Sequence, residues 1–368
     1  MSDACEDCLR RSWLLGQLSH LLEYQARDRQ RLLALLGLSD GELIQAIAGR
    51  RREEIYERHQ QFTLKDIGSS DGVETICRHR HGYPHALKDD GAPRMLYVAG
   101  PVQRLQELGT QPAVAVVGSR RATDYGMEMA RSLAHGLAAN GVVVTLGLSD
   151  GIAVAAQTGA LEAKGKALTV MDRGLDVACP SRRRALYERT RSTGCAVVEL
   201  PFGARPRRWC YTARERIVVG MAQLTIVVEA DEEPSELLGA RVAKALGRTV
   251  AAVPGRVTSP VSRGTHALLM EGAALVRGPE DALELLDKRD TPHRMTGALK
   301  ANRLEPRLKA TLEQVGAGRD TPAKLTAGSA DAGEVLLTLS ELELMGLLTR
   351  GDGGRYVPRA SLADGAPL

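Results

Sequence analysis

The chain has 368 residues, of which 43% are hydrophobic, 26% are charged and 3% are aromatic, and its formal net charge at pH 7 is +4. This length favours two or three domains, and the composition is ordinary for a globular protein. The mild positive charge permits an anionic partner without requiring one. No apolar run approaches the length of a membrane span, so we expect a cytoplasmic protein that makes no membrane contact.

Residues 1–65 are predicted to form a small helical, SAM-like domain. Leucines recur at helical spacing between residues 14 and 22 and again between 32 and 36. Ser39 and the following residues to Glu42 predict the N-cap of a third helix that continues through Ile44 and Ile47. We interpret this module as a packing or dimerisation unit rather than a catalytic one.

Two groups of residues have side chains that can bind metal. These are Cys5 with Cys8, and Cys77 with His79, His81 and His85. Neither group is followed by a second pair at the spacing of a zinc site. We therefore interpret the cysteines as reduced thiols and the histidines as structural or solvated residues, and we predict no metal and no cofactor.

Short apolar segments alternate with helical stretches from about residue 113 to residue 287. The predicted strands are 113–117, 142–146, 167–171, 196–200, 224–229 and 250–253, and the predicted helices are 124–139, 152–163, 182–193 and 235–246. Almost continuously apolar strands are typical of a parallel sheet buried on both faces. Residues 66–287 are therefore predicted to form an extended Rossmann-like α/β domain with a doubly wound, mostly parallel sheet.

The last part of the chain predicts a third unit. Residues 288–304 are polar and without period, which indicates a linker. Within residues 305–368, a short helix starts at Thr321, a longer helix covers 333–347, and a glycine-rich turn at 351–354 leads into Tyr356. Helices followed by a hairpin of this kind suggest a winged-helix-like domain.

Two glycine turns follow the first two predicted strands. One contains Gly118, Ser119 and Arg120, and the other contains Gly147 and Gly151. In an open α/β sheet, ligands bind beyond the carboxyl ends of the strands. Backbone N–H groups at a helix start attract an anion, and an arginine adds a bidentate phosphate donor. The two turns together predict a phosphate-binding floor, although either turn alone could simply close a strand–helix connection.

Residues 205–216, between the fourth and fifth predicted strands, are predicted to form a loop that combines five arginines with Trp209 and Tyr211. Guanidinium groups hold phosphates while aromatic rings stack on bases, so this mixture favours single-stranded nucleic acid over a merely solvated loop. The sequence contains no G-x-S-x-G, H-E-x-x-H or Walker A motif, and we predict no enzyme activity.

A series of short matches extends over about residues 80–287. They include Tyr83-Pro84, Val117-Gly118-Ser119-Arg120 with Tyr125-Gly126, Gly147-Leu148 with Gly151-Ile152, Gly174-Leu175-Asp176, Arg214-x-Arg216-Ile217, Glu229-Ala230 and Pro254-Gly255. In this order and spacing they resemble the DprA/Smf family, the DNA-processing proteins of natural transformation in competent bacteria. The resemblance implies a Rossmann-like protein that binds single-stranded DNA, helps to load the RecA recombinase and forms a homodimer.

The resemblance also implies a set of DNA-contacting residues. By motif, these are Gly118, Ser119, Arg120, Arg208, Tyr211, Arg214 and Arg216, to which the second glycine turn adds Gly147 and Gly151. The chain departs from the family pattern at Ala153, where Asp is usual, at Gln157, where His is usual, and at Glu215, where Asn is usual. A carboxylate at position 215 would repel phosphate if it faced the groove, and would weaken binding less if it paired with a flanking arginine.

Two alternatives to a single-stranded DNA binder remain. The same sheet could bind a nucleotide or process a nucleoside monophosphate, although the turn after the last predicted strand reads Pro254, Gly255, Arg256 and Val257 instead of the Pro-Gly-Gly-x-Gly-Thr of such phosphoribohydrolases. The chain could also be a DprA-like scaffold with reduced DNA affinity, which the residues at 153 and 157 motivate. Base release and oligonucleotide binding discriminate these functions.

Overall fold

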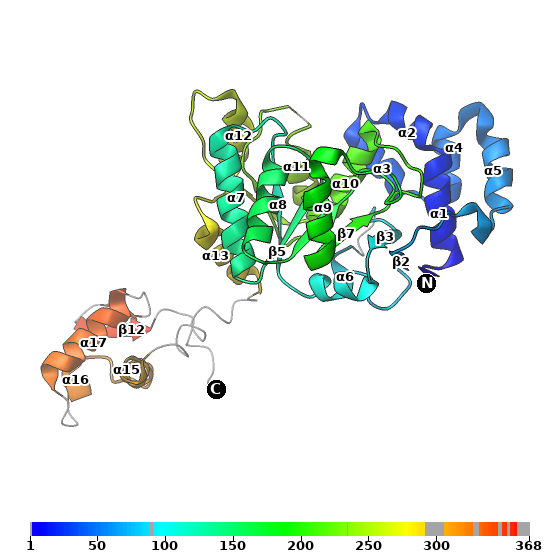
Figure 1. Ribbon diagram of the computed structural model, residues 1–368. Helices are drawn as coiled ribbons and strands as arrows, with labels where there is room; N and C mark the ends of the chain where they lie inside the picture. The colour runs from blue at the N-terminus through cyan, green and yellow to red at the C-terminus, as the bar shows by residue number, and fades with distance from the viewer. Residues whose placement is uncertain are drawn as a thin grey trace. The chain divides into compact units, whose positions relative to one another are not determined.

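The computed structural model describes residues 2–87, 91–233, 235–290, 305–326, 331–344, 348–351 and 354–358. The chain divides into two compact units, Met1–Leu283 and Glu284–Leu368, and each is described by itself (Figure 1). None of the described helices has both the length and the apolar character that crossing a membrane requires.

One sheet runs through the first unit, and its described strands have the order β1-β2-β3-β7-β6-β5-β4-β8-β9-β10. The strands are β1 (Ser2–Asp3), β2 (Val73–Cys77), β3 (Met95–Ala99), β4 (Ala113–Val117), β5 (Val143–Gly147), β6 (Ala167–Val170), β7 (Cys195–Val198), β8 (Leu224–Val227), β9 (Thr249–Ala252) and β10 (Ala274–Leu275). From β7 to β10 all neighbours are parallel, whereas β3 is antiparallel to β2 and β7. The predicted doubly wound, mostly parallel sheet is confirmed.

The connections between strands decide which helices cover which face. The helices between β4 and β9 are α7 (Asp124–Ala139), α8 (Ile152–Glu162), α9 (Ser181–Thr193), α10 (Arg208–Gly220) and α11 (Leu238–Ala245). Right-handed crossovers from β4 outward to β7 place α7, α8 and α9 on one face, where Figure 1 shows them side by side. The order reverses at β8, so α10 and α11 cover the other face. Both faces of the sheet are therefore covered, which explains the fully buried sequence of β4.

Further helices complete the first unit. They are α1 (Glu6–Gln17), α2 (Ser19–Gln25), α3 (Arg29–Gly37), α4 (Asp40–Ile47), α5 (Arg52–Gln60), α6 (Val102–Gly109) and α12 (Arg263–Met270). A further helix, α13 (Pro279–Asp290), begins in the first unit and continues past its boundary at Leu283. The predicted cap of α4 is confirmed: the Ser39 N–H donates to Glu42 Oε2 (2.9 Å), and the Glu42 N–H donates to Ser39 Oγ (3.4 Å). Because α2 and α3 contact α10, the N-terminal helices pack on the Rossmann-like part of the same unit. The predicted domain boundary at residue 65 stays a prediction.

The second unit contains α15 (Pro306–Gly316), α16 (Pro322–Thr326) and α17 (Ala332–Leu344), followed by the antiparallel pair β11 (Leu348–Arg350) and β12 (Tyr356–Pro358). Its core includes Leu312, Leu339, Leu342 and Tyr356. The elements α16, α17 and the β11–β12 pair follow the expected order, whereas α15 was not predicted. The winged-helix-like assignment stays a prediction. The predicted linker at 288–304 stays a prediction: α13 continues to Asp290, and residues 291–304 lie outside the described residues. Residues 345–347 and 352–353, within the predicted longer helix and glycine-rich turn, also lie outside them.

Candidate nucleic-acid interface

A hollow of about 810 Å³ lies beyond the carboxyl ends of the parallel strands. The turns after β4, β5 and β6 contribute Arg120, Leu148 and Asp172, the segment leading into α10 contributes Arg207, and α3 contributes Arg29. The chain order reverses at β4, which has β5 on one side and β8 on the other. Ligands of doubly wound sheets bind at such a switch point, so the hollow occupies the expected place.

Arginine dominates the lining, and we call this site the arginine hollow. Its arginines are Arg29, Arg120, Arg173, Arg182, Arg183, Arg207, Arg208 and Arg214. Its carboxylates are Glu23, Asp172 and Glu236. The excess of guanidinium groups suits a polyanion, because each can form paired hydrogen bonds with a phosphate.

Carboxylates neutralise some of these arginines and leave others available. The paired arginines are Arg173 with Asp172, Arg182 and Arg183 with Asp150, Arg208 with Glu23, and Arg214 with Glu215. Within the part of the chain that the structure describes, Arg29, Arg120 and Arg207 form no ion pair. Arg120 and Arg207 are also exposed. These three side chains are therefore best placed to bind phosphate.

The turn after β4 is held by its own hydrogen bonds. The Ser119 N–H donates to the carbonyl of Glu229 (2.7 Å), and its Oγ donates to Glu236 Oε1 (2.9 Å). Ser119 Oγ also accepts a hydrogen bond from the N–H of Arg121 at 3.1 Å. Ser119 is buried and shapes the turn, whereas Gly118 and Arg120 line the hollow.

Gly147 and Gly151, the two predicted glycines of the second turn, do not line the hollow. Each of them lets a neighbouring group lie close to the backbone of the turn. A Cβ at Gly147 would lie 2.4 Å from Nε of Arg214, so only glycine leaves room for that guanidinium. Gly151 has a φ of +66°, and a Cβ there would lie 2.3 Å from the carbonyl oxygen of Ser119. The N–H of Ile152 donates to the same carbonyl (3.2 Å), so the two turns lie in direct contact.

Arg214 lies in the wall of the hollow with only 3% of its side chain exposed. Its Nη2 donates to Glu215 Oε1 (2.8 Å), its Nη1 donates to the carbonyl of Leu148 (3.4 Å), and the guanidinium carbon lies 4.6 Å from the ring centroid of Tyr211. Glu215 is thus paired with Arg214 and is not part of the lining, which decides between the two alternatives for this carboxylate. Burial raises the pKa of Tyr211, so its hydroxyl stays protonated.

Arg216, another predicted contact, lies outside the hollow. Residues 214 and 216 are about 200° apart around an α-helix, so their side chains leave α10 on opposite sides. Arg216 is buried, donates to the carboxylate of Glu199 and the carbonyl of Gly91, and borders a separate small cavity with Leu33. In this structure Arg216 joins α10 to its neighbours.

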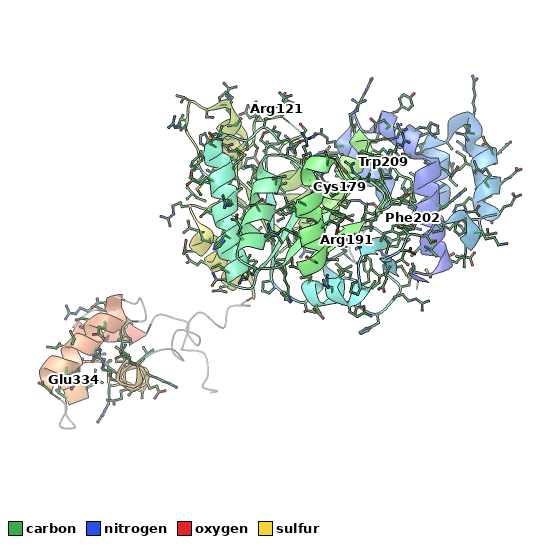
Figure 2. The ribbon with its side chains drawn as sticks, viewed as in Figure 1. Arg121, Cys179, Arg191, Phe202, Trp209 and Glu334 are labelled. Atoms are coloured by element: carbon green, nitrogen blue, oxygen red, sulfur yellow. The ribbon has the colours of Figure 1, made fainter. Side chains whose placement is uncertain are left out.

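The segment predicted as an arginine–aromatic loop is instead largely the start of α10. Trp209 is 1% exposed, and its Nε1 donates to Oγ of Ser19 (3.0 Å), where α10 meets the N-terminal helices (Figure 2). Trp209, Ala213 and Ile217 follow one another at helical i, i+4 spacing and are all buried. Trp209 is therefore a core residue, and the earlier interpretation as a stacking surface is wrong for it.

Arg182 and Arg183, at the start of α9, line the hollow although neither was predicted as a site residue. Their Nη2 atoms lie 2.7 and 2.6 Å from Oδ2 of Asp150. The hydrogen bond from Arg183 and the nearby arginine charges lower the pKa of Asp150. The sequence did carry a signal, because this helix follows the third predicted strand and the same carboxyl-edge rule applies to it.

Gln157, where the resembling family usually has His, lies away from the hollow. Its Nε2 donates to Oγ1 of Thr169 (3.0 Å) and to Oγ1 of Thr190 (2.7 Å), which joins α8 to β6 and α9. The side chain is fully buried. This departure therefore changes the packing between elements and does not directly change the lining of the hollow.

Comparisons with known proteins found a matching family model and similar relatives. A family model described as DNA recombination-mediator protein A matches residues 74–287. A relative from Mycobacterium tuberculosis (strain CDC 1551 / Oshkosh), named as a DNA processing protein DprA, is 36% identical over 288 residues, covering 75% of this chain and 71% of the relative.

Two solved structures are also similar. The X-ray structure of DNA processing protein A from Streptococcus pneumoniae matches with a TM-score of 0.59 and 30% identity, covering 67% of this chain and 86% of that chain. A structure of DNA processing protein A from Helicobacter pylori, described for its single-stranded DNA binding mode, matches with a TM-score of 0.51 and 26% identity, covering 59% of this chain and 96% of that chain.

Proposed function

The chain belongs to the DNA recombination-mediator protein A family, and from this membership we propose that it is a non-enzymatic DNA-processing protein that binds single-stranded DNA in the arginine hollow. The observation that carries the proposal is the lining of the hollow, in which Arg29, Arg120 and Arg207 form no ion pair with any described residue. Guanidinium groups of this kind bind phosphate oxygens without reading base sequence. The preference for a single strand draws support from the likeness to the Helicobacter pylori protein.

Phosphate contacts dominate the proposed binding mode, and base stacking contributes less. Tyr211 is the aromatic side chain in the lining, and the guanidinium of Arg214 already lies over its ring. Trp209 is buried and cannot stack on a base. Each bound phosphate releases counterions, so affinity falls as the salt concentration rises. The logarithm of the binding constant should fall with the logarithm of the salt concentration, with a slope of about −0.7 for each phosphate that the protein neutralises.

A titration of fluorescent oligothymidylates by anisotropy, over a series of salt concentrations, tests the proposal. The charge-reversal pair Arg120→Glu with Arg207→Glu should weaken binding by about tenfold or more and flatten the salt dependence. Arg214 is left intact because it is buried and ion-paired, so that its replacement would also report on folding.

The matched control is Arg189→Glu, an exposed arginine on α9 that is not part of the lining. It should bind oligonucleotides like the wild type. If the double variant also binds like the wild type, the hollow is not the binding site; if the wild type prefers duplex over single strands, the proposed substrate is wrong.

We propose in addition that the chain assists a RecA-type recombinase and forms a homodimer. Both parts rest on the family resemblance described from the sequence. The first is tested by recombinase filament assembly on oligonucleotides coated with single-strand-binding protein, which the chain should accelerate. The homodimer is tested by analytical ultracentrifugation. A protein that sediments as a monomer at micromolar concentration would contradict it.

One observation favours a second candidate, a scaffold with reduced DNA affinity. Five of the arginines in the hollow are already paired with carboxylates, and Glu236 and Glu23 add negative charge to its lining. A stable complex with the recombinase, combined with no oligonucleotide binding at low salt, would favour the scaffold.

A further inference from the structure

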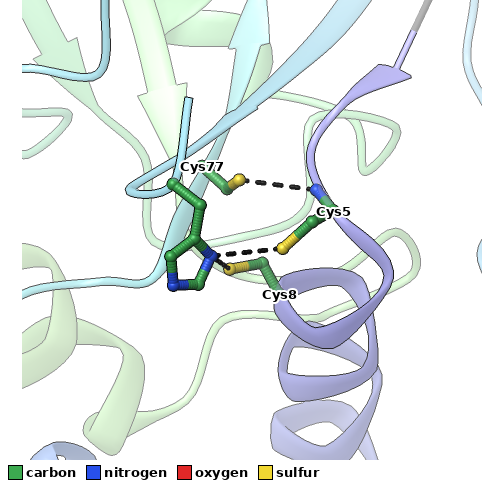
Figure 3. Close-up of side chains that lie close together, drawn as sticks. Cys5, Cys8 and Cys77 are labelled. Carbon is green, nitrogen blue, oxygen red and sulfur yellow. Dashed lines mark hydrogen bonds between the residues drawn. The ribbon is translucent and has the colours of Figure 1, made fainter. Parts of the chain in front are cut away.

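Four side chains with metal-binding chemistry converge at the edge of the sheet in the first unit. The ligand atoms of Cys5, Cys8, Cys77 and His79 all lie within 4.8 Å of one another (Figure 3). His79 Nδ1 lies 3.2 Å from Sγ of Cys5 and 3.4 Å from Sγ of Cys8. Sγ of Cys77 accepts a hydrogen bond from the N–H of Cys5 at 3.4 Å. This cluster is separate from the arginine hollow, whose lining contains none of these four residues.

Strand pairing brings the two halves of the cluster together. Cys5 is the N-cap of α1, and Cys8 lies in the first turn of that helix. Cys77 is the last residue of β2, and His79 follows two positions later. The parallel pairing of β1 with β2, in which Asp3 lies opposite Ile76, brings the start of α1 to the end of β2. The Cys-x-x-Cys and Cys-x-His segments, 72 positions apart, thus form one site.

We propose that Cys5, Cys8, Cys77 and His79 bind a structural zinc ion. Zinc binds thiolate sulfur at about 2.3 Å and imidazole nitrogen at about 2.0 Å in a tetrahedron, which separates the ligand atoms by about 3.5–3.8 Å. The two distances from His79 Nδ1 to the sulfurs, 3.2 and 3.4 Å, lie within a few tenths of an ångström of this spacing. All pairs lie within 4.8 Å, so the widest pair needs to close by about 1 Å at most. Three thiolates and one imidazole fill all four positions, so the site is closed and structural rather than catalytic.

The burial of the ligands also favours a metal over a redox pair. Cys8 and Cys77 are fully buried, Cys5 is half-buried, and His79 is exposed. A reactive Cys-x-x-Cys pair requires one accessible thiolate. Its chemistry does not require a third thiol and an imidazole next to the pair. In the zinc site the imidazole of His79 covers the side that faces solvent.

The site fastens the N-terminal helices to the sheet. Because β1 has only two residues, its backbone pairing alone is a weak attachment. The helix that carries Cys8 also places Trp13, Leu14 and Leu15 in the core, and the following α2 and α3 bring Glu23 and Arg29 to the arginine hollow. Zinc bound here contributes to folding directly and keeps one wall of the hollow in place.

Metal analysis of the untagged full-length protein, purified under reducing conditions from zinc-supplemented cells, tests the proposal. The wild type should contain about one zinc ion per chain. The Cys5→Ser with Cys8→Ser variant should contain almost none, while Cys179→Ser, which removes a thiol outside the cluster, should keep the metal. Wild-type protein without zinc, or a double variant that keeps it, would overturn the site.

Cobalt substitution identifies the ligands without depending on the stability of the double variant. The Co²⁺ protein should show thiolate-to-metal charge transfer in the near ultraviolet and the intense visible bands of tetrahedral coordination. His79→Cys should retain the metal and strengthen the charge-transfer band, because a fourth thiolate replaces the imidazole. A weak octahedral spectrum, or an intact-mass measurement showing a Cys5–Cys8 disulfide in metal-free protein, would identify a redox pair instead. These readouts do not involve DNA, so the zinc site and the proposed function succeed or fail separately.

Discussion

The guanidinium of Arg214 has four neighbours at the wall of the arginine hollow. Glu215 and Asp172 pair with its charge, the carbonyl of Leu148 accepts one N–H, and the guanidinium lies over the ring of Tyr211. A buried ion pair of this kind shapes the site while it reduces the positive potential available to a phosphate. We therefore expect the residue at position 215 to tune the proposed DNA affinity without touching DNA.

Glu215→Gln tests this tuning. The amide keeps the size of the carboxylate and can still accept from Arg214, but it removes the negative charge. We expect oligonucleotide affinity to rise about threefold to tenfold at low salt. Stability should fall by about 1–3 kcal/mol, because the buried guanidinium of Arg214 loses the nearer of its two carboxylate partners and keeps only Asp172. Anisotropy and urea denaturation measure the two effects, with the exposed Glu188→Gln on α9 as control. A lower DNA affinity in a folded variant would contradict the argument.

Asp40, the first residue of α4, connects α1, α5 and the segment directly before β3. It accepts hydrogen bonds from Arg11 (3.1 Å), His59 (2.9 Å) and Arg94 (3.2 Å). Burial acts to raise the pKa of this carboxyl, but the hydrogen bond from His59 and the charges of the two arginines outweigh it, so the pKa lies below its usual value. A depressed carboxyl pKa stabilises the fold above the unfolded-state pKa, and this stabilisation is lost as the pH falls through the folded-state value.

Asp40→Asn should lower the free energy of unfolding at pH 7 by about 2–4 kcal/mol, since it leaves the buried Arg11 without an anionic partner. The difference from the wild type should narrow as the pH falls below about 4, where Asp40 of the unfolded chain takes up a proton. Urea denaturation between pH 7 and pH 3.5 checks both statements. Asp7→Asn, at an exposed carboxylate of α1, serves as the control. If the difference in the free energy of unfolding between the two proteins does not change with pH, the charge of Asp40 does not contribute to stability.

At the scale of elements, α10 has two roles on different sides. Arg208, 74% exposed, and Arg214 line the hollow from its first turns, while Trp209 anchors the same helix against Ser19 of α2. Glu23 accepts from both Arg208 and the Trp209 N–H, so it also stabilises the N-terminus of α10. The packing of α10 on the N-terminal helices thus positions the arginines.

Trp209→Phe separates these roles. The variant loses the hydrogen bond to Ser19 and part of the buried ring, so we expect a loss of stability of about 1–3 kcal/mol. Oligonucleotide affinity should stay within about twofold, because the side chain is buried and does not line the hollow. Trp13→Phe, the same substitution in α1, is the matched control. A large loss of affinity at unchanged stability would restore the stacking interpretation.

Periodicity predicted most central elements correctly. The six predicted strands correspond to β4 through β9, because strands buried on both faces are short, apolar and continuous. The two-residue strands β1 and β10 carry too little pattern, and the antiparallel β2 and β3 fall outside the repeating strand–helix series. The start of α10 was predicted as a loop because its arginines and aromatic residues were interpreted by composition, although their spacing is helical.

At the scale of the whole molecule, the arginine hollow lies entirely within the unit Met1–Leu283. The core of the second unit is built from its own residues, among them Leu312, Leu339 and Tyr356. The two units therefore have separate cores, and we expect the proposed DNA binding in the hollow not to require the second unit.

Truncation after Asp290, at the end of α13, tests this independence. Affinity for single-stranded oligonucleotides and the slope of its salt dependence should stay within about twofold of the full-length values, because every lining residue is retained. Anisotropy on the two proteins makes the comparison, and thermal unfolding of the truncated chain confirms that it is folded. A loss of tenfold or more in folded protein would mean that the second unit takes part in binding.

The sequence by itself determined the parallel strand–helix series, the glycine turns at the carboxyl ends of β4 and β5, and an arginine-rich segment beside them, because these depend on local spacing and residue type. The tertiary structure decided what each side chain faces. Helix geometry placed Trp209 in the core and sent Arg216 away from Arg214, and packing of α3 brought Arg29 to the hollow. Pairing of β1 with β2 joined Cys5 and Cys8 to Cys77 and His79. Such contacts depend on pairing between distant segments, which local patterns do not carry.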